Sequence, residues 1–123
     1  MPAKKPKEEA EVEDPSTENV IGISVLGVDY LVDLDAMTAD LLRECFDTLG
    51  KSEVQIVLDL NSQPGRLYLA NFIWLAVRSA GRWITFDDAF ALANPEAMRS
   101  AKPLTGKKLA QSLAAAREAH PQS

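Results

Sequence analysis

The spacing of hydrophobic and polar residues changes character near residue 19 and again near residue 102. The first 18 residues are rich in Lys, Glu and Pro and contain a single Val, which is too little apolar surface to offset the entropy lost on ordering. The last 22 residues contain good helix formers but few large apolar side chains, namely Leu104, Leu109 and Leu113. The pattern predicts three parts: a disordered acidic tail over 1–18, a single folded domain over 19–101, and a mobile, basic, Ala-rich tail with helical tendency over 102–123.

The folded part opens with the stretch VIGISVLGVDYLVDL, in which two apolar runs flank a turn at Gly27. Both runs are rich in β-branched residues, which predicts a β-hairpin. In the second run Asp29, Leu31 and Asp33 alternate with more apolar neighbours, so we expect one wet face or edge. An isolated hairpin is marginally stable in water, and this one is therefore expected to pack on the helices that follow.

A helix is predicted next, over residues 35–49, beginning at Asp35 or Thr38 as N-cap and ending at Gly50 as C′ residue. Its apolar positions recur at helical spacing and form one stripe: Leu41, Leu42, Cys45, Phe46 and Leu49. Residues 53–62 are compatible with a helix or a strand. Ser52 and Gln55 form a capping-box pattern that favours the helix, whereas the β-branched residues around Ile56 suit a strand.

Residues 67–80 are apolar on almost every side, which is typical of a membrane span or of a central core helix. A helix of about 14 residues is roughly 21 Å long, shorter than the ~30 Å hydrocarbon core of a bilayer. The segment is therefore predicted to be the core helix of the domain. Thr85, with Asp88 three residues later, predicts a short helix over 85–93, and Asn94 followed by Pro95 predicts another.

These elements predict an α+β, predominantly α fold in which an N-terminal β-hairpin packs on three to four helices between disordered termini. The composition, with 46% hydrophobic and 25% charged residues, is typical of a soluble domain. The first 18 residues carry a net charge of −3, the last 22 carry +3, and the middle carries −5. An acidic folded part argues against a nucleic-acid-binding face.

Residue types that usually mark a catalytic, cofactor or metal site are sparse. The single histidine, His120, is three residues from the end, and the single cysteine, Cys45, is expected to be a small buried hydrophobe. Asp87 and Asp88 are interpreted as helix-capping residues rather than a carboxylate pair. No phosphate-binding glycine loop and no signal-peptide apolar segment is present. We therefore expect no enzyme activity and no cofactor, and a protein that stays in the compartment where it is made.

The remaining class is a binding protein. A domain this small buries its surface incompletely, so some of its large aromatic residues are expected to be exposed. Trp83, just past Gly81, is the first candidate. The predicted partner-binding residues are Trp83, Tyr68, Leu109 and Leu113.

Two stretches, GVDYLVDLDAMTADLLRE and NFIWLAVRSAGRWITFDDAFAL, resemble the tail assembly chaperones of long-tailed, siphovirus-type phages of actinobacterial hosts. The resemblance covers roughly residues 20–93. It implies a non-catalytic protein that binds the tape measure protein and keeps it soluble while tail-tube protein polymerises around it. It also implies self-association, a location in the host cell cytoplasm, no membrane contact and absence from the mature virion.

The same resemblance implies a longer product made by a −1 ribosomal frameshift near the end of the reading frame. The candidate position for this slip is encoded by Thr105, Gly106, Lys107 and Lys108, whose codons are able to form a slippery heptamer. Two other functions remain open: a small virion component such as a head–tail adaptor, and an antitoxin-like regulatory module. The regulatory function requires salt-dependent nucleic-acid binding by the basic tail.

Overall fold

The β-hairpin is formed as predicted, by β1 (Val20–Val25) and β2 (Val28–Asp33), which pair in antiparallel register with Val25 opposite Val28. The computed structural model describes residues 15–62 and 65–119. Most of the predicted acidic tail, and His120, lie outside this part of the chain. The two turn residues, Leu26 and Gly27, both have positive φ, at 50° and 81°. Such a turn matches the right-handed twist of the two strands.

Leu26 is an unfavourable residue for this turn, because most residues with a Cβ are strained at positive φ. Gly has no Cβ, and the short polar side chain of Asn hydrogen-bonds locally, so these two residues are preferred there. Leu26 is half exposed and contributes only its backbone N–H to a bond with Ser100 Oγ, at 2.9 Å. Leu26→Asn is therefore expected to raise the free energy of unfolding by about 0.5–1 kcal/mol, measured by urea denaturation. Leu26→Val, which is β-branched, should lower it; equal stability of the two variants would contradict the assignment of strain to this residue.

A third strand that was not predicted, β3 (Lys102–Leu104), completes the sheet. It pairs antiparallel with β1, placing Leu104 opposite Gly22, and the strand order is β2-β1-β3. β3 has only three residues and contains Pro103, which is tolerated because it lies in an edge strand. Its sequence carries no alternation of its own, so its pairing partner about 80 residues earlier decides its conformation.

The helices follow the predicted order. After a 3₁₀ turn (η1, Leu34–Ala36), the elements are α1 (Ala39–Leu49), α2 (Glu53–Ser62), α3 (Arg66–Ser79), α4 (Phe86–Leu92), α5 (Pro95–Ser100) and α6 (Gly106–Ala119). Residues 53–62 are thus helical. Side-chain oxygens cap the starts of four helices, in each case at a position proposed from the sequence: Thr38, Ser52, Thr85 and Asn94. Asp35 is not the cap of α1; it belongs to η1, where its N–H bonds to Asp33.

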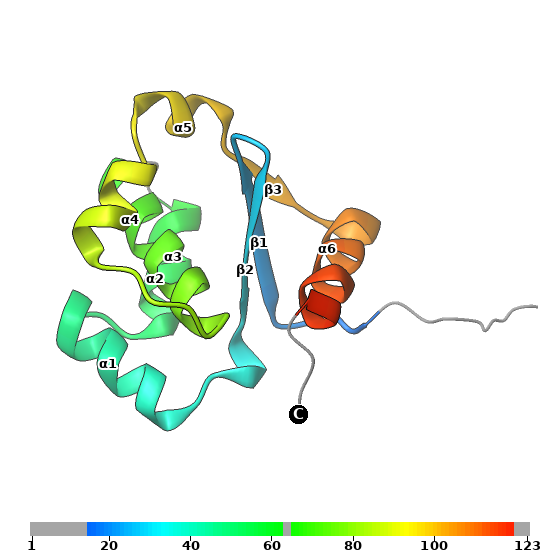
Figure 1. Cartoon of the computed structure of the whole chain (residues 1–123), viewed down its shortest axis with the longest axis horizontal. Helices are drawn as coiled ribbons and strands as arrows, with labels where there is room; N and C mark the ends of the chain where they lie inside the picture. The colour runs from blue at the N-terminus through cyan, green and yellow to red at the C-terminus, as the bar shows by residue number, and fades with distance from the viewer. Residues whose placement is uncertain (1–14, 63–64, 120–123) are drawn as a thin grey trace, which may run out of the picture.

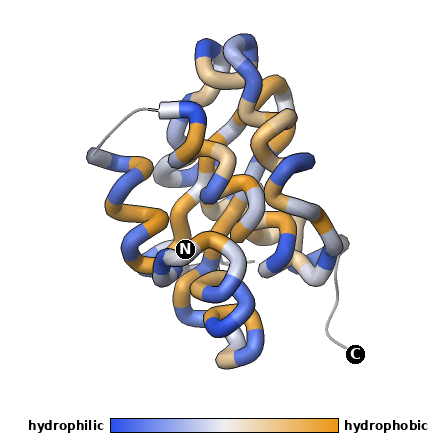
Figure 2. The backbone as a smooth tube through the Cα atoms, turned by 90° about the vertical axis from the view of Figure 1, so that its left-hand side faces the viewer, coloured by the Kyte–Doolittle hydropathy of each residue, from blue (hydrophilic) through white to orange (hydrophobic). Residues whose placement is uncertain are grey.

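The core is centred on α3, as predicted for the apolar segment 67–80. Residues 69–76 of this helix are all buried, and all of them except the polar Asn71 belong to one hydrophobic cluster with Val32 of β2, Ile56 of α2 and Ala89 of α4. Helices α1 to α5 form a layer on one face of the sheet (Figure 1), and Figure 2 views this layer face on, with apolar segments crossing its centre. No helix in the described part of the chain has the length and apolarity needed to cross a membrane.

The other face of the sheet is covered by α6 (Figure 1). This face was predicted to be exposed to water, and the folded domain was predicted to end at residue 101, so both expectations are corrected. Leu109 and Leu113 of α6 are buried against Val20, with Leu31 and Leu104 packed beside them. The predicted boundary left residues 102–119 outside the domain because their only large apolar side chains are Leu104, Leu109 and Leu113. These three leucines suffice because the sheet offers a second, separate apolar surface, to which Leu104 itself belongs.

Gly22 allows α6 to approach the sheet closely. A Cβ at this position would lie 2.7 Å from Leu109 Cδ1 and 2.8 Å from Leu31 Cδ2, closer than carbon atoms pack. Gly22 is in the central strand, where glycine usually weakens pairing. Its place there is explained by the helix above it. The overall result is three layers: α1–α5, a three-stranded antiparallel sheet, and α6.

Candidate interaction surface

Trp83 is the most exposed large hydrophobic residue among those described, with 74% of its surface accessible. It lies in the loop between α3 and α4, two residues after Gly81, whose φ of 83° lets the chain turn away from the helix end. The guanidinium of Arg78 stacks on the indole, with Cζ 5.2 Å from the ring centroid. The exposed indole is therefore supported from one side by a cation of α3.

Arg78 is itself fixed by two further groups. It donates two hydrogen bonds to the Glu44 carboxylate of α1, at 2.7 and 3.3 Å, and one to the carbonyl oxygen of Arg82, at 2.7 Å. The side chains of Arg78 and Glu44 are only 20% and 30% exposed, so this two-point contact is largely shielded from water. We call Trp83, Arg78 and Glu44 the Trp83 platform. The contact with Arg78 restricts the orientation of the exposed indole, which lowers the entropy lost when a partner binds.

Other large apolar side chains are exposed on the same layer of helices. Phe46 of α1 is 60% exposed, and Val54 and Leu58 of α2 are each about half exposed, one turn apart on the same side of their helix. Phe46 belongs to the apolar stripe that was predicted for this helix, but only Cys45 of that stripe is fully buried. The stripe is wider than the surface that the neighbouring helices cover, and helical spacing alone does not show this.

The other predicted partner-binding residues lie elsewhere. Tyr68 of α3 is half-buried under the ammonium group of Lys51, 4.6 Å from the ring centroid, and Lys51 is paired with Asp59 at 2.6 Å. Leu109 and Leu113 are on the face of α6 that packs on the sheet, so they are buried and offer no surface to a partner while this helix is docked. The four residues of the candidate frameshift position are exposed at the turn from β3 into α6: Thr105, Gly106, Lys107 and Lys108.

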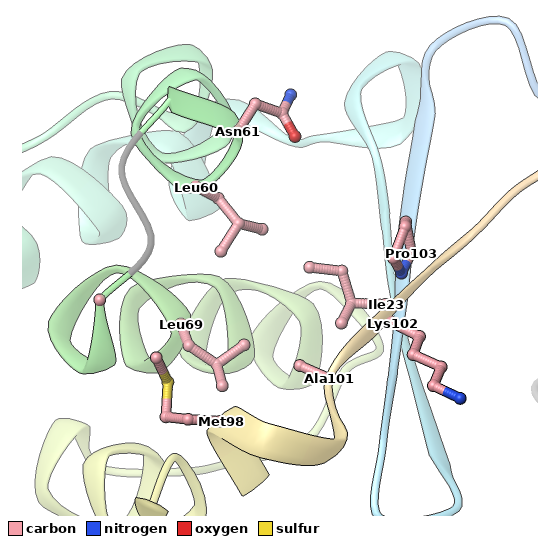
Figure 3. A pocket seen from close by; sticks show the side chains of 9 residues that line it. Ile23, Leu60, Asn61, Leu69, Met98, Ala101, Lys102 and Pro103 are labelled. Atoms are coloured by element: carbon pink, nitrogen blue, oxygen red, sulfur yellow. The ribbon is translucent and has the colours of Figure 1, made fainter.

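A cavity of about 310 Å³ opens where α2, α3 and α5 meet the sheet (Figure 3). Its wall is mainly apolar and includes Leu60, Leu69 and Met98 from three different helices. The polar side chains at its edge are Asn61 and Lys102, and Figure 3 shows the ammonium group of Lys102 extending away from the cavity. Such a lining suits an apolar group and offers no set of converging acids, bases or nucleophiles.

The aspartates considered in the sequence have structural partners. Asp29 accepts a hydrogen bond from Ser112, Asp33 from Arg117, and Asp35 from Asn19. The backbone N–H of Asp88 donates a hydrogen bond to the Thr85 hydroxyl, so Asp88 belongs to the capped first turn of α4. Within the described residues, no group of three or more His, Cys, Asp or Glu side chains is placed to hold a metal ion.

Cys45 is fully buried, and its Sγ lies 3.4 Å from the carbonyl oxygen of Lys51. Burial, reinforced by the charges of Glu53 and Glu44, raises the pKa of its thiol from 9.0 to about 11. A raised pKa keeps the thiol protonated in the folded chain, which makes it a poor nucleophile at neutral pH.

The shift predicts a loss of stability in alkali. Between pH 9 and 11 the unfolded chain has released the Cys45 proton while the folded chain still binds it, so stability falls as the pH rises through this window. The full contribution is roughly 3 kcal/mol, and about 1 kcal/mol should be lost between pH 8 and pH 10. Urea denaturation at the two pH values measures it. A Cys45→Ala chain should lose about 1 kcal/mol less than the unmodified chain, and identical losses would contradict the assignment.

Comparison with known protein families, curated proteins and solved structures finds no match to this chain.

Proposed function

We propose that this chain is a non-catalytic tail assembly chaperone, which binds the tape measure protein of a long-tailed phage and keeps it soluble while the tail tube assembles. The observation that carries the proposal is the Trp83 platform, an exposed indole in contact with Arg78, which Glu44 holds in place. Tryptophan and arginine are the residues most enriched at the energetic centres of protein interfaces. An exposed aromatic residue that is fixed in this way is better explained by partner binding than by packing.

The resemblance to tail assembly chaperones supports the identity of the partner. One of the two resembling stretches, residues 71–92, contains Arg78 and Trp83 together with the turn between them and the Thr85 cap of α4. The half-exposed Val54, Leu58 and Phe46 add apolar surface on the same helical layer. A chaperone that shields apolar helices of a client needs complementary apolar surface of its own. The proposal includes the host cytoplasm as location, self-association, and absence from the mature virion.

Co-expression with the longest protein encoded in the same phage genome tests the proposal. We expect that long protein to become soluble only when this chain is present, and to be recovered with it in a pull-down whose size is measured by light scattering. No binding and no change in solubility would contradict the proposal. Recovery of the chain in purified virions would instead favour a head–tail adaptor.

The gene sequence tests the accompanying proposal of a −1 frameshift. Codons for residues 105–108 that form no slippery heptamer would remove its support. A slip here would replace α6 and leave β3 in place, because α6 begins at Gly106. The longer product is then expected to differ from the short one on only one face of the sheet.

A further inference from the structure

Helix α6 is attached to the domain by a small contact of its own. Its buried side chains, Leu109, Ala110 and Leu113, do not belong to the main core cluster around α3, which lies on the opposite face of the sheet. Most other α6 side chains are exposed. Removing α6 from its place would therefore leave the packing of α1–α5 unchanged. Elements with few buried apolar contacts are the ones that open locally at low free energy.

The surface beneath α6 has the features of a helix-binding site. Its apolar floor consists of Val20, Leu31 and Leu104, and Gly22 at its centre leaves room for a leucine to approach the strand. We call these four residues the α6 site. The two leucines of α6 that fill it are four residues apart, as in helices that bind grooves through anchors on one face.

Two aspartates on the rim of the α6 site bond to α6, and the sheet residues at this rim, Asp29, Asp33 and Lys102, carry a net charge of −1. Asp29 accepts a hydrogen bond from Ser112 at 2.8 Å, and Asp33 pairs with Arg117 at 3.1 Å. Helix α6 itself has three basic residues and one acidic residue. The site thus selects an amphipathic helix with two leucines at i and i+4, a hydroxyl just before the second leucine, and a basic residue four positions after it.

Helix α6 fills this site incompletely. A cleft of about 560 Å³ remains between α6 and the strands, and most of its lining is polar: Ser24, Asp29, Lys102, Lys108, Gln111 and Ser112, with Pro103 and Leu104. The helix is joined to β3 through Thr105 and Gly106, and Gly106 has a φ of 58°, a conformation that residues with a side chain rarely adopt. The connection is therefore short and depends on glycine.

We propose that the α6 site binds a basic, amphipathic helix of a protein partner, and that α6 is its resident occupant, which the partner helix displaces. The charge of the rim and the spacing of the leucines define the chemistry of the partner helix. The unfilled cleft, whose lining is mostly polar, leaves room for a partner helix with longer polar side chains than those of α6. This surface lies on the opposite side of the sheet from the α3 layer that carries the Trp83 platform, and the inference does not depend on the identity proposed for the client.

The test uses the full-length chain and a labelled synthetic peptide of residues 106–119 as probe, with binding followed by fluorescence anisotropy. Gly106→Ile makes the turn into α6 unfavourable, and no atom lies within 4 Å of the added Cβ to clash with it. Because docked α6 competes with the peptide, this variant should bind the peptide about tenfold more tightly than the unmodified chain. Gly50→Ile is the matched control, since Gly50 also has positive φ and open space but lies at the end of α1. It should bind like the unmodified chain.

A peptide carrying Leu109→Ala and Leu113→Ala should not bind. Absence of saturable binding to a folded Gly106→Ile chain, or equal binding of this control peptide, would overturn the inference. Exchange of α6 between two copies, seen as a dimer of the Gly106→Ile chain by light scattering, would overturn the choice of a partner protein in favour of a second copy.

Hydrogen exchange on the unmodified chain provides a second test, which needs no variant. The amides of residues 110–118 should exchange at least about tenfold faster than those at the centre of α3. Equal protection would mean that α6 opens only when the whole domain unfolds, and the inference would fail. Neither the peptide-binding experiment nor the hydrogen-exchange experiment involves Trp83, so their outcomes are distinguishable from that of the co-expression test.

Discussion

Replacing Phe72 by alanine is expected to lower the free energy of unfolding by about 3–5 kcal/mol, a large fraction of the about 5–15 kcal/mol that stabilises a typical domain. Phe72 is fully buried at the centre of α3, within the cluster that joins this helix to β2, α2 and α4. The substitution removes an aromatic ring from a close-packed interior that relaxes only in part. Urea denaturation followed by circular dichroism measures the loss.

Leu67→Ala is the matched control in the same helix. Leu67 is 51% exposed, so removing it should cost no more than about 0.5–1 kcal/mol. A loss of the same size in both variants would mean that α3 is stabilised by its own helical propensity rather than by the packing of its buried positions. If α3 is the central core helix, the loss of unfolding free energy in Phe72→Ala should be several times the loss in Leu67→Ala.

The second large effect concerns binding rather than stability. Trp83→Ala should weaken binding of the co-expressed client at least about 30-fold, the loss typical when an interface anchor is truncated. The free energy of unfolding should change by less than about 0.5 kcal/mol because most of the indole is in water. Titration of the purified client, together with urea denaturation of the chain alone, separates the two effects.

Two further variants define the part played by the platform. Leu92→Ala removes another exposed large apolar side chain, 43% accessible, and should leave client binding within about twofold of the unmodified chain. Glu44→Gln weakens the contact that orients Arg78 and should weaken client binding less than Trp83→Ala does. Equal binding by the Trp83→Ala chain and the unmodified chain would show that the platform is not the client-binding surface.

The parts of the fold that local chemistry determines could be predicted from the sequence. Residues within a few positions of one another specify each of these parts: the hairpin turn at Gly27, the caps at Thr38 and Thr85, and the apolar core helix α3. Residues 53–62 were ambiguous because their side chains suit both a helix and a strand. The Ser52 cap, together with packing against α3, selects the helix.

The parts that depend on distant segments could not be predicted. Strand β3 has three residues and takes its conformation from β1, and α6 docks with two leucines on a sheet face whose floor comes from all three strands. Exposure of Trp83 was expected from its position after Gly81, but the support by Arg78 and Glu44 joins residues 34 positions apart. Phe46 was placed on the correct face of α1, yet only the tertiary arrangement shows that this face is not fully covered.

Because the sheet is a single layer of strands, its central strand directs alternate side chains into two clusters that share no buried residue. Ile21, Ile23 and Val25 face the α3 side, whereas Val20 and Gly22 face α6. Substitutions that share no contacts have additive effects on stability. A double variant with one change in each cluster should therefore show no coupling energy, and the residues under α6 are free to diverge without compensating changes around α3.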